Sequence, residues 1–130
     1  MKILFETSEC APFSKSGGLA DVAFSLPPAM KELGNEVIIV TPYYQCVKQR
    51  FPRKTRRIAT YNVNLGNRTL YCGIRKGNLD GVAVYFIEND ELFDRPKLYG
   101  YDDDKFRFVG YLTFITQFVF TVVSPKSNII

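Results

Sequence analysis

Two short apolar runs separated by a helical pattern constrain the fold of this chain more than any other feature. The runs predict strands at residues 2–5 and 36–41, and apolar residues at helical spacing predict a helix over residues 19–33. Such a strand–helix–strand order is typical of a βαβ unit, whose two strands are parallel and joined by a right-handed crossover. Because both runs are uninterrupted, we expect strands that are covered on both faces.

Prolines and a glycine shape the predicted helix. Pro27 and Pro28 fall inside the helical pattern, where a proline loses a hydrogen bond and collides with the preceding turn. The sequence therefore predicts either a kinked helix or two short helices, with a proline in the first turn of the second. Gly34 stands where a C-cap glycine ends a helix.

A glycine pair, Gly17 and Gly18, lies where the first strand gives way to the helix. Glycine has no side chain and tolerates positive φ, so backbone can approach a ligand closely there. The unpaired N–H groups and positive dipole end of the helix favour an anion such as phosphate, and Lys15 adds a positive charge. Asp21 adds a carboxylate in the first turn. The spacing matches neither common phosphate loop, so a plain strand–helix turn with a solvated Lys15 is an equal alternative.

Residues 45–57 form a basic run with six lysines and arginines. One interpretation is a patch for nucleic acid, polyphosphate or an acidic partner. We favour a solvated surface loop broken by Pro52, because nucleic-acid grooves combine charge with stacking aromatics and this run offers only Phe51.

Alternating patterns predict three antiparallel strands between residues 58 and 87, inserted into the α/β domain. Turns are expected at residues 66–67 and 77–81. Cys72 falls on the apolar side of the middle strand and is expected to be a small core residue. The apolar residues that alternate in the first two strands are Tyr61, Val63, Leu65, Leu70, Cys72 and Ile74.

Residues 88–104 are predicted to be a loop rich in Asp, Pro and Tyr. Its acidic pairs would suit acid–base chemistry or Ca²⁺, but the EF-hand spacing is absent, so we favour Asp102 or Asp103 as the cap of the next helix. Tyr99 and Tyr101 flank a glycine, and their rings would either bind the C–H face of a sugar or anchor the loop.

The last predicted helix begins near Lys105, and residues 112–123 are almost wholly apolar. This segment is shorter than the ~20 residues that a membrane span needs. Three threonines and Gln117 also interrupt it, so we expect a buried helix or strand.

Residue counts exclude several classes of protein. Three cysteines without paired spacing argue against a disulfide framework and fit a reducing compartment. The absence of histidine excludes a Ser-His or Cys-His nucleophile pair within these 130 residues. The sequence also has no C-x-x-C motif or histidine cluster that would indicate a transition-metal site. Lys2 is followed by only three apolar residues, so no signal peptide is evident. We expect a cytoplasmic protein without a membrane partner, and the interpretation of the basic run given above predicts no nucleic-acid partner.

Two blocks resemble one family. Residues 1–13 (MKILFETSECAPF) and 15–22 (KSGGLADV) closely resemble the amino terminus of bacterial glycogen synthases and plant starch synthases. Residues 85–101 (YFIENDELFDRPKLYGY) resemble the same family, in the order that the family has them. The resemblance covers residues 1–110 and fades over residues 111–130, where the family's amphipathic helix, strand and His-Asp-x-His-like region are not matched.

The resemblance implies a retaining glucosyltransferase of the GT-B type, with two Rossmann-like domains and the active site between them. Such enzymes move glucose from ADP-glucose to the non-reducing end of an α-1,4-glucan, without a metal ion or other cofactor. Residues 1–130 would be an incomplete amino-terminal catalytic domain: an α/β, Rossmann-like parallel sheet with an antiparallel β-hairpin insertion.

The resemblance also implies roles for particular residues. Lys15 would contact the phosphates of the nucleotide sugar, and the Gly17–Gly18 pair would let the loop approach the sugar or diphosphate. Asp21 would shape the acceptor side of the cleft, and Tyr99 and Tyr101 would line it. Donors held at the diphosphate would stabilise the charge that develops on this leaving group. No catalytic residue is assigned.

Much of the family's machinery has no counterpart in this sequence. The carboxy-terminal domain, with most nucleotide contacts, is absent, as are the histidine and aspartate found later in the amino-terminal domain. We therefore expect no useful glucosyl transfer by this chain alone. Two alternatives stay open: a non-catalytic α-glucan-binding or interaction module, and a nucleic-acid binder that would show steep salt dependence.

Overall fold

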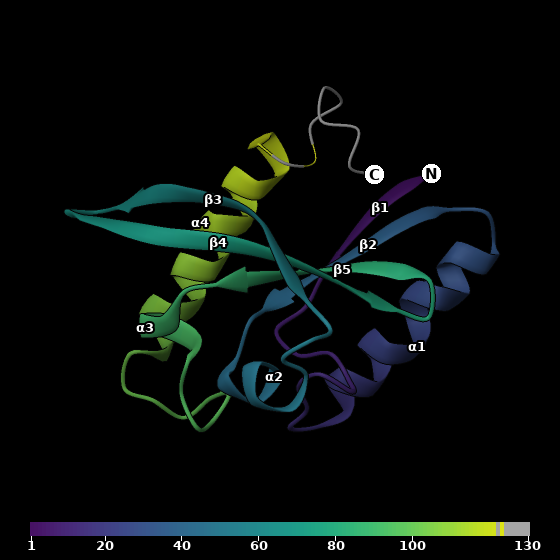
Figure 1. The fold of residues 1–130 in the computed structure, drawn as a ribbon, viewed down its shortest axis with the longest axis horizontal. Coiled ribbons are helices and arrows are strands. Elements are labelled where there is room, and N and C mark those ends of the chain that lie inside the picture. Colours follow the sequence, from purple (N-terminus) through teal and green to yellow (C-terminus); the bar gives the residue numbers. More distant parts are fainter. Residues whose placement is uncertain (122, 124–130) are drawn as a thin grey trace.

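The structure, a computed structural model, describes residues 1–121 and 123. One mixed sheet forms its centre, with strand order β1-β2-β5-β4-β3 (Figure 1). The strands are β1 (Lys2–Glu6), β2 (Glu36–Pro42), β3 (Arg56–Leu65), β4 (Arg68–Leu79) and β5 (Val82–Glu88). The helices are α1 (Gly18–Glu32), α2 (Gln45–Arg50), α3 (Asp90–Phe93) and α4 (Asp104–Thr121).

The parallel half of the sheet contains the predicted βαβ unit. β1 pairs in parallel with β2, and β2 pairs in parallel with β5. The run at residues 37–40 of β2 is buried, as its uninterrupted apolar character predicted. Residues 3–5 are only half-buried, because β1 is the edge strand of the described sheet, and here the expectation of two covered faces was wrong.

The antiparallel half confirms the three predicted strands, and Cys72 is fully buried. The β3–β4 hairpin extends the same sheet through β5. The turn between β4 and β5 is shorter than predicted, because Asp80 (φ 50°) and Gly81 (φ 83°) make the turn while residues 77–79 stay in β4. Gly77 serves packing instead: an added Cβ would lie 3.0 Å from the Lys54 carbonyl oxygen.

Helix α1 runs without a break through both prolines, so the two-helix alternative was wrong. It ends as predicted, with Gly34 at φ 93° donating to the Lys31 carbonyl while Asn35 donates to the Met30 carbonyl. The buried face was not the expected one. It consists of Ala20, Ala23 and Pro27, whereas most of the apolar residues whose spacing predicted the helix are exposed.

Helix α4 packs on one face of the sheet, and loop residues cover the other face at β5. Tyr85 contacts Phe118 of α4, whereas its neighbour Phe86 contacts Phe13 and Tyr43 on the opposite face. α4 confirms the predicted last helix; Phe114 and Phe118 are buried, while its outward residues are exposed. α2 and α3 form where loops were predicted. None of the helices in the described residues is long and apolar enough to cross a membrane.

Candidate functional site: the glycine loop at the carboxyl edge of the sheet

Loops that follow β1, β2 and β5 meet at the carboxyl edge of the parallel strands, as the βαβ pattern predicts. The Tyr44 hydroxyl, just after β2, donates to the Ser8 carbonyl at 2.7 Å. The Tyr111 hydroxyl of α4 lies 3.0 Å from the Thr7 carbonyl oxygen and 2.9 Å from that of Val40. We call residues 7–18, which connect β1 to α1 and carry the glycine pair, the glycine loop. These bonds fix its start against the sheet.

Glu9 binds the backbone donors that lie directly before the helix N-terminus, where the sequence predicts a phosphate. Its carboxylate accepts from the backbone N–H of Ser16 (3.2 Å) and Gly17 (3.0 Å) and from the Ser16 hydroxyl (2.6 Å). Glu9 is 2% exposed. Burial opposes its ionisation, but these hydrogen bonds, with one from Tyr99, hold its pKa below the usual value. The first amides of the loop therefore already hold an internal anion.

Tyr99 reaches the glycine loop from the far end of the chain. Its hydroxyl donates to Glu9 Oε2 at 2.8 Å and lies 2.8 Å from Ser8 Oγ. Burial raises the pKa of Tyr99 to about 12, so the phenol stays a donor at neutral pH. The two predicted site segments are thus joined through Glu9, a residue that the sequence did not single out.

Tyr101 lies away from the glycine loop. Its hydroxyl accepts from the Lys97 backbone N–H at 2.9 Å. The charged groups of Arg95, Lys97 and Arg107 lie 5.0–5.1 Å from its ring centroid. These are the contacts of a loop anchor, and a role in lining an acceptor cleft stays a prediction.

Arg107 holds the loop that carries Tyr99. Its side chain is fully buried; Nε donates to the Leu92 carbonyl (2.6 Å), and Nη1 donates to the Leu98 carbonyl (3.0 Å) and to Asp104 Oδ1 (2.7 Å). Sequence reasoning missed this residue. The signal was a lone arginine within the aromatic stretch at the start of α4.

The acids before α4 secure the same loop. Asp103 directly precedes the helix, as predicted for a cap, but its carboxylate pairs with Arg95 at 2.6 and 2.7 Å. Asp104 accepts from the backbone N–H of Gly100 and of Tyr101. Within the described residues, no cluster of three or more Cys, Asp or Glu side chains could hold a metal ion.

Lys15 and Asp21 face each other across the opening of the glycine loop. Lys15 Nζ lies 2.8 and 3.0 Å from the two Asp21 oxygens, and both side chains are more than half exposed. An exposed pair of this kind adds little stability and is easily exchanged for another partner. The pair therefore leaves Lys15 available to a ligand.

The glycine pair is not explained by backbone strain or by packing within the described chain. Gly17 is extended (φ −164°), and neither Gly17 nor Gly18 has a positive φ, so that reason for glycine was wrong here. A Cβ added at either position would meet nothing within 4 Å. The loop is open on this side within the described chain, and a role for the two glycines in the close approach of a ligand stays a prediction.

The basic run is partly paired, contrary to the expected solvated loop. Lys48 of α2 lies 2.9 Å from Asp90 and 3.1 Å from Asp94, and Arg57 lies 2.8 Å from Glu88. These pairs tie residues 45–57 to the end of β5 and to the segment after it. Carboxylates thus already neutralise part of the charge that a nucleic acid would need.

Parallel strands joined by a helix, with the connecting glycine loop at the carboxyl edge of the sheet, define a Rossmann-like α/β domain. The sequence profile of the starch synthase catalytic domain matches residues 2–127, and the chain belongs to this family. The α/β fold is thereby confirmed as part of the amino-terminal domain of the GT-B architecture.

Known relatives agree with this assignment. The chain is 46% identical over 120 residues to a glycogen synthase of Caldicellulosiruptor bescii, covering 92% of this chain and 25% of that protein. It is 50% identical over 108 residues to a glycogen synthase of Bacillus anthracis, covering 83% and 23%. The catalytic domain of starch synthase IV from Arabidopsis thaliana, bound to ADP and acarbose, superposes with a TM-score of 0.82 at 28% identity, covering 90% and 24%. The chain spans about a quarter of the length of these relatives.

Proposed function

We propose that this chain supplies the amino-terminal half of the donor-sugar cleft of a glycogen or starch synthase. The reaction would transfer glucose from ADP-glucose to the non-reducing end of an α-1,4-glucan. The open glycine loop carries this proposal: Gly17 and Gly18 have free space above them, and Lys15 stands beside it. In this proposal residues 1–130 form an incomplete amino-terminal catalytic domain, and the divergence of residues 111–130 stays a prediction.

Each residue of the loop has a physical task in this proposal. The amides that follow Gly17 point along the axis of α1, and the positive end of the helix dipole favours a diphosphate. Lys15 would exchange Asp21 for a phosphate oxygen and stabilise the charge that develops on the leaving group. Asp21, released from Lys15, would then shape the acceptor side of the cleft, and the proposed reaction uses no metal ion or other cofactor.

The isolated chain should bind the donor weakly and transfer no glucose at a useful rate, because the proposed cleft has only one of its two walls. The experiment is a calorimetric titration of the purified chain with ADP-glucose, beside an assay of glucosyl transfer to glycogen. Lys15→Ala should weaken ADP-glucose binding about tenfold, the value of one charge-assisted hydrogen bond.

Lys105→Ala is the matched control, since Lys105 is an exposed lysine on α4, and it should bind like the parent chain. Equal affinity of the Lys15→Ala and parent chains would remove Lys15 from the donor site. Measurable glucosyl transfer by the parent chain would refute the one-wall proposal.

A further inference from the structure

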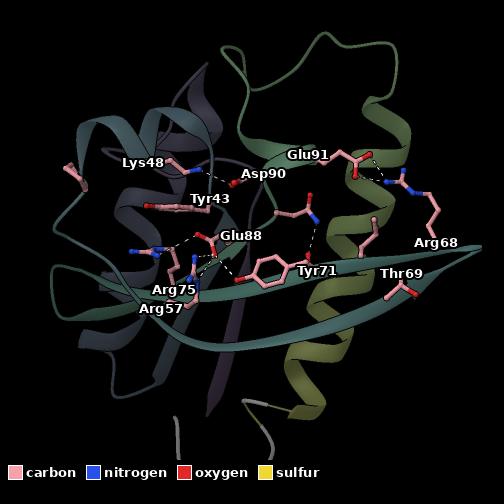
Figure 2. Close-up of a pocket in the computed structure, with 13 residues that line it drawn as sticks. Tyr43, Lys48, Arg57, Arg68, Thr69, Tyr71, Arg75, Glu88, Asp90 and Glu91 are labelled. Atoms are coloured by element: carbon pink, nitrogen blue, oxygen red, sulfur yellow. Dashed lines mark hydrogen bonds and ion pairs between the residues drawn. The ribbon is translucent and has the colours of Figure 1, made fainter.

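A groove opens around the end of β5, and none of the residues of the proposed donor site lines it. It has a volume of about 680 Å³, within the range of pockets that hold small ligands. Its lining residues come from β4, from Arg57 of β3, from the end of β5 with α3, and from residues 43–52 in and around α2 (Figure 2). Glu88 lies at the centre of Figure 2, among Arg57, Arg75 and Tyr71.

Glu88 is a buried carboxylate with one oxygen engaged and one open. Its side chain is 7% exposed. Oε1 lies 2.8 and 2.9 Å from two nitrogens of Arg57 and accepts from the Tyr71 hydroxyl at 3.3 Å. Oε2 accepts no hydrogen bond within the described part of the chain, and Arg75 Nη1 lies 3.6 Å from it. Glu88 Oε2, an acceptor, and Arg75 Nη1, a donor, therefore lie side by side without forming a hydrogen bond.

The backbone of β4 makes room for this carboxylate. Gly73 stands directly opposite Glu88 in the sheet. A Cβ on Gly73 would lie 2.4 Å from Glu88 Oε1 and 2.9 Å from the Tyr71 hydroxyl oxygen, distances that real structures do not tolerate. A glycine inside a strand loses side-chain packing, so its presence marks a place where something must come close.

The charges around the groove are paired at short distance. Lys48 lies 2.9 Å from Asp90, and Arg68 lies 2.6 Å from Glu91. Three carboxylates face four cations across the lining, so neither a polyanion nor a metal ion finds a field of one sign. Paired donors and acceptors suit a neutral ligand whose groups both donate and accept.

The ring of Tyr71 supplies an apolar surface in the same groove. Tyr71 is 41% exposed, although its hydroxyl is held at Glu88. Arg75 lies over the ring of Tyr43, with its charged carbon 5.0 Å from the centroid, which keeps its guanidinium in place. An exposed ring beside a preorganised carboxylate–guanidinium pair is suited to the C–H face and the hydroxyl groups of one sugar.

We infer that this groove is a sugar-binding site, in which hydroxyl groups of a neutral glycan donate to Glu88 Oε2 and accept from Arg75 while one ring lies on Tyr71. That the glycan is an α-glucan rests on the function proposed above. Glu88 ends β5 on the same edge of the sheet that carries the glycine loop. A glucan in the groove would be held on the domain that also takes part in the donor cleft.

The test is affinity electrophoresis of the 130-residue chain in gels that contain glycogen, beside calorimetry with maltoheptaose and with ADP-glucose. Tyr71→Ala should weaken glucan binding about tenfold, because it removes the exposed ring. Tyr71→Phe is the matched control; it keeps the ring, loses one hydrogen bond, and should stay within about threefold of the parent. Glu88→Gln should weaken glucan binding too, and Tyr71→Ala still decides the matter if unpaired arginines keep that variant from folding.

The two proposals fail separately. Lys15→Ala should weaken ADP-glucose binding and leave glycogen retention unchanged, whereas Tyr71→Ala should do the reverse. A parent chain that glycogen does not retain, or a folded Tyr71→Ala chain that is retained like the parent, would overturn the groove as a sugar site. Displacement of maltoheptaose by inorganic pyrophosphate, abolished by Arg75→Gln, would make it an anion site and overturn the inference as well. Loss of ADP-glucose binding alone would count against the donor-site proposal only.

Discussion

Replacing Arg107 with methionine should loosen the loop that carries Tyr99 and destabilise the chain. The substitution removes the donors to two carbonyls, those of Leu92 and Leu98, and the partner of Asp104. The Asp104 side chain is 31% exposed and can turn to water, so its loss counts little. Each carbonyl left without a donor costs about 1–3 kcal/mol.

Methionine fills much of the same volume and avoids the desolvation of a cation, which recovers part of that loss. We therefore expect a net loss of about 2–4 kcal/mol in the free energy of unfolding. With a urea m-value of about 2 kcal/mol/M, the unfolding midpoint should fall by about 1–2 M.

The assay is urea unfolding followed by circular dichroism, with amide hydrogen exchange over residues 95–101 as the local readout. Lys105→Met, an exposed change on the same helix, serves as control and should move the midpoint by no more than about 0.3 M. An Arg107→Met midpoint within that margin, or unchanged exchange in the loop, would refute the view that Arg107 fixes this segment.

Three further predictions concern the glycine loop and the sheet. Glu9→Gln should lower the free energy of unfolding in urea by about 1–3 kcal/mol, because an amide cannot accept hydrogen bonds from all four donors that Glu9 binds. An unchanged unfolding midpoint would contradict the view that Glu9 holds the glycine loop. Gly18→Ala should leave stability within about 0.5 kcal/mol of the parent, whereas Gly73→Ala should cost at least about 1 kcal/mol; equal midpoints would refute the contrast. The pKa values of Glu9, Asp103 and Asp104 are lowered in the folded chain, so their contribution is full above the unfolded values near pH 4 and disappears as the pH falls through the folded ones. The melting temperature should therefore fall between pH 5 and pH 3, and a rise over that interval would contradict the assignment.

Hydrophobic pattern was sufficient to predict most of the sheet. The strands around residues 37–40 and 82–87 are uninterrupted apolar runs because both of their faces are covered. Such a run can be recognised in the sequence without knowing which strands or helices pack against it. The C-cap role of Gly34 could also be predicted from the sequence, because helices commonly end at a residue with left-handed backbone angles, which glycine adopts most easily.

The errors share a cause, which is that sequence pattern does not reveal what lies opposite a residue. Gly77 was predicted to be part of a turn, although it lies in β4, where an added Cβ would be only 3.0 Å from the Lys54 carbonyl oxygen. The apolar spacing of α1 predicted a helix, but of the residues that made up this pattern only Ala23 is buried, together with Ala20 and Pro27. Glu9 carried no signal, because its partner Tyr99 is distant in sequence and the loop that brings Ser16 to it is closed only in the fold.

Glu9 also changes how a phosphate could bind at the glycine loop. A ligand phosphate and the Glu9 carboxylate would be two anions at one helix end, so they repel unless they use separate donors. Glu9 holds the amides of Ser16 and Gly17, which moves a phosphate outward, toward the amides that begin α1 and toward Lys15. The exposed Lys15–Asp21 pair is the contact that can open at small cost, whereas the Glu9 contacts cannot. In the proposed donor site, the loop would therefore use the amides of Ser16 and Gly17 to keep its shape, and Lys15 with the first amides of α1 to bind the ligand.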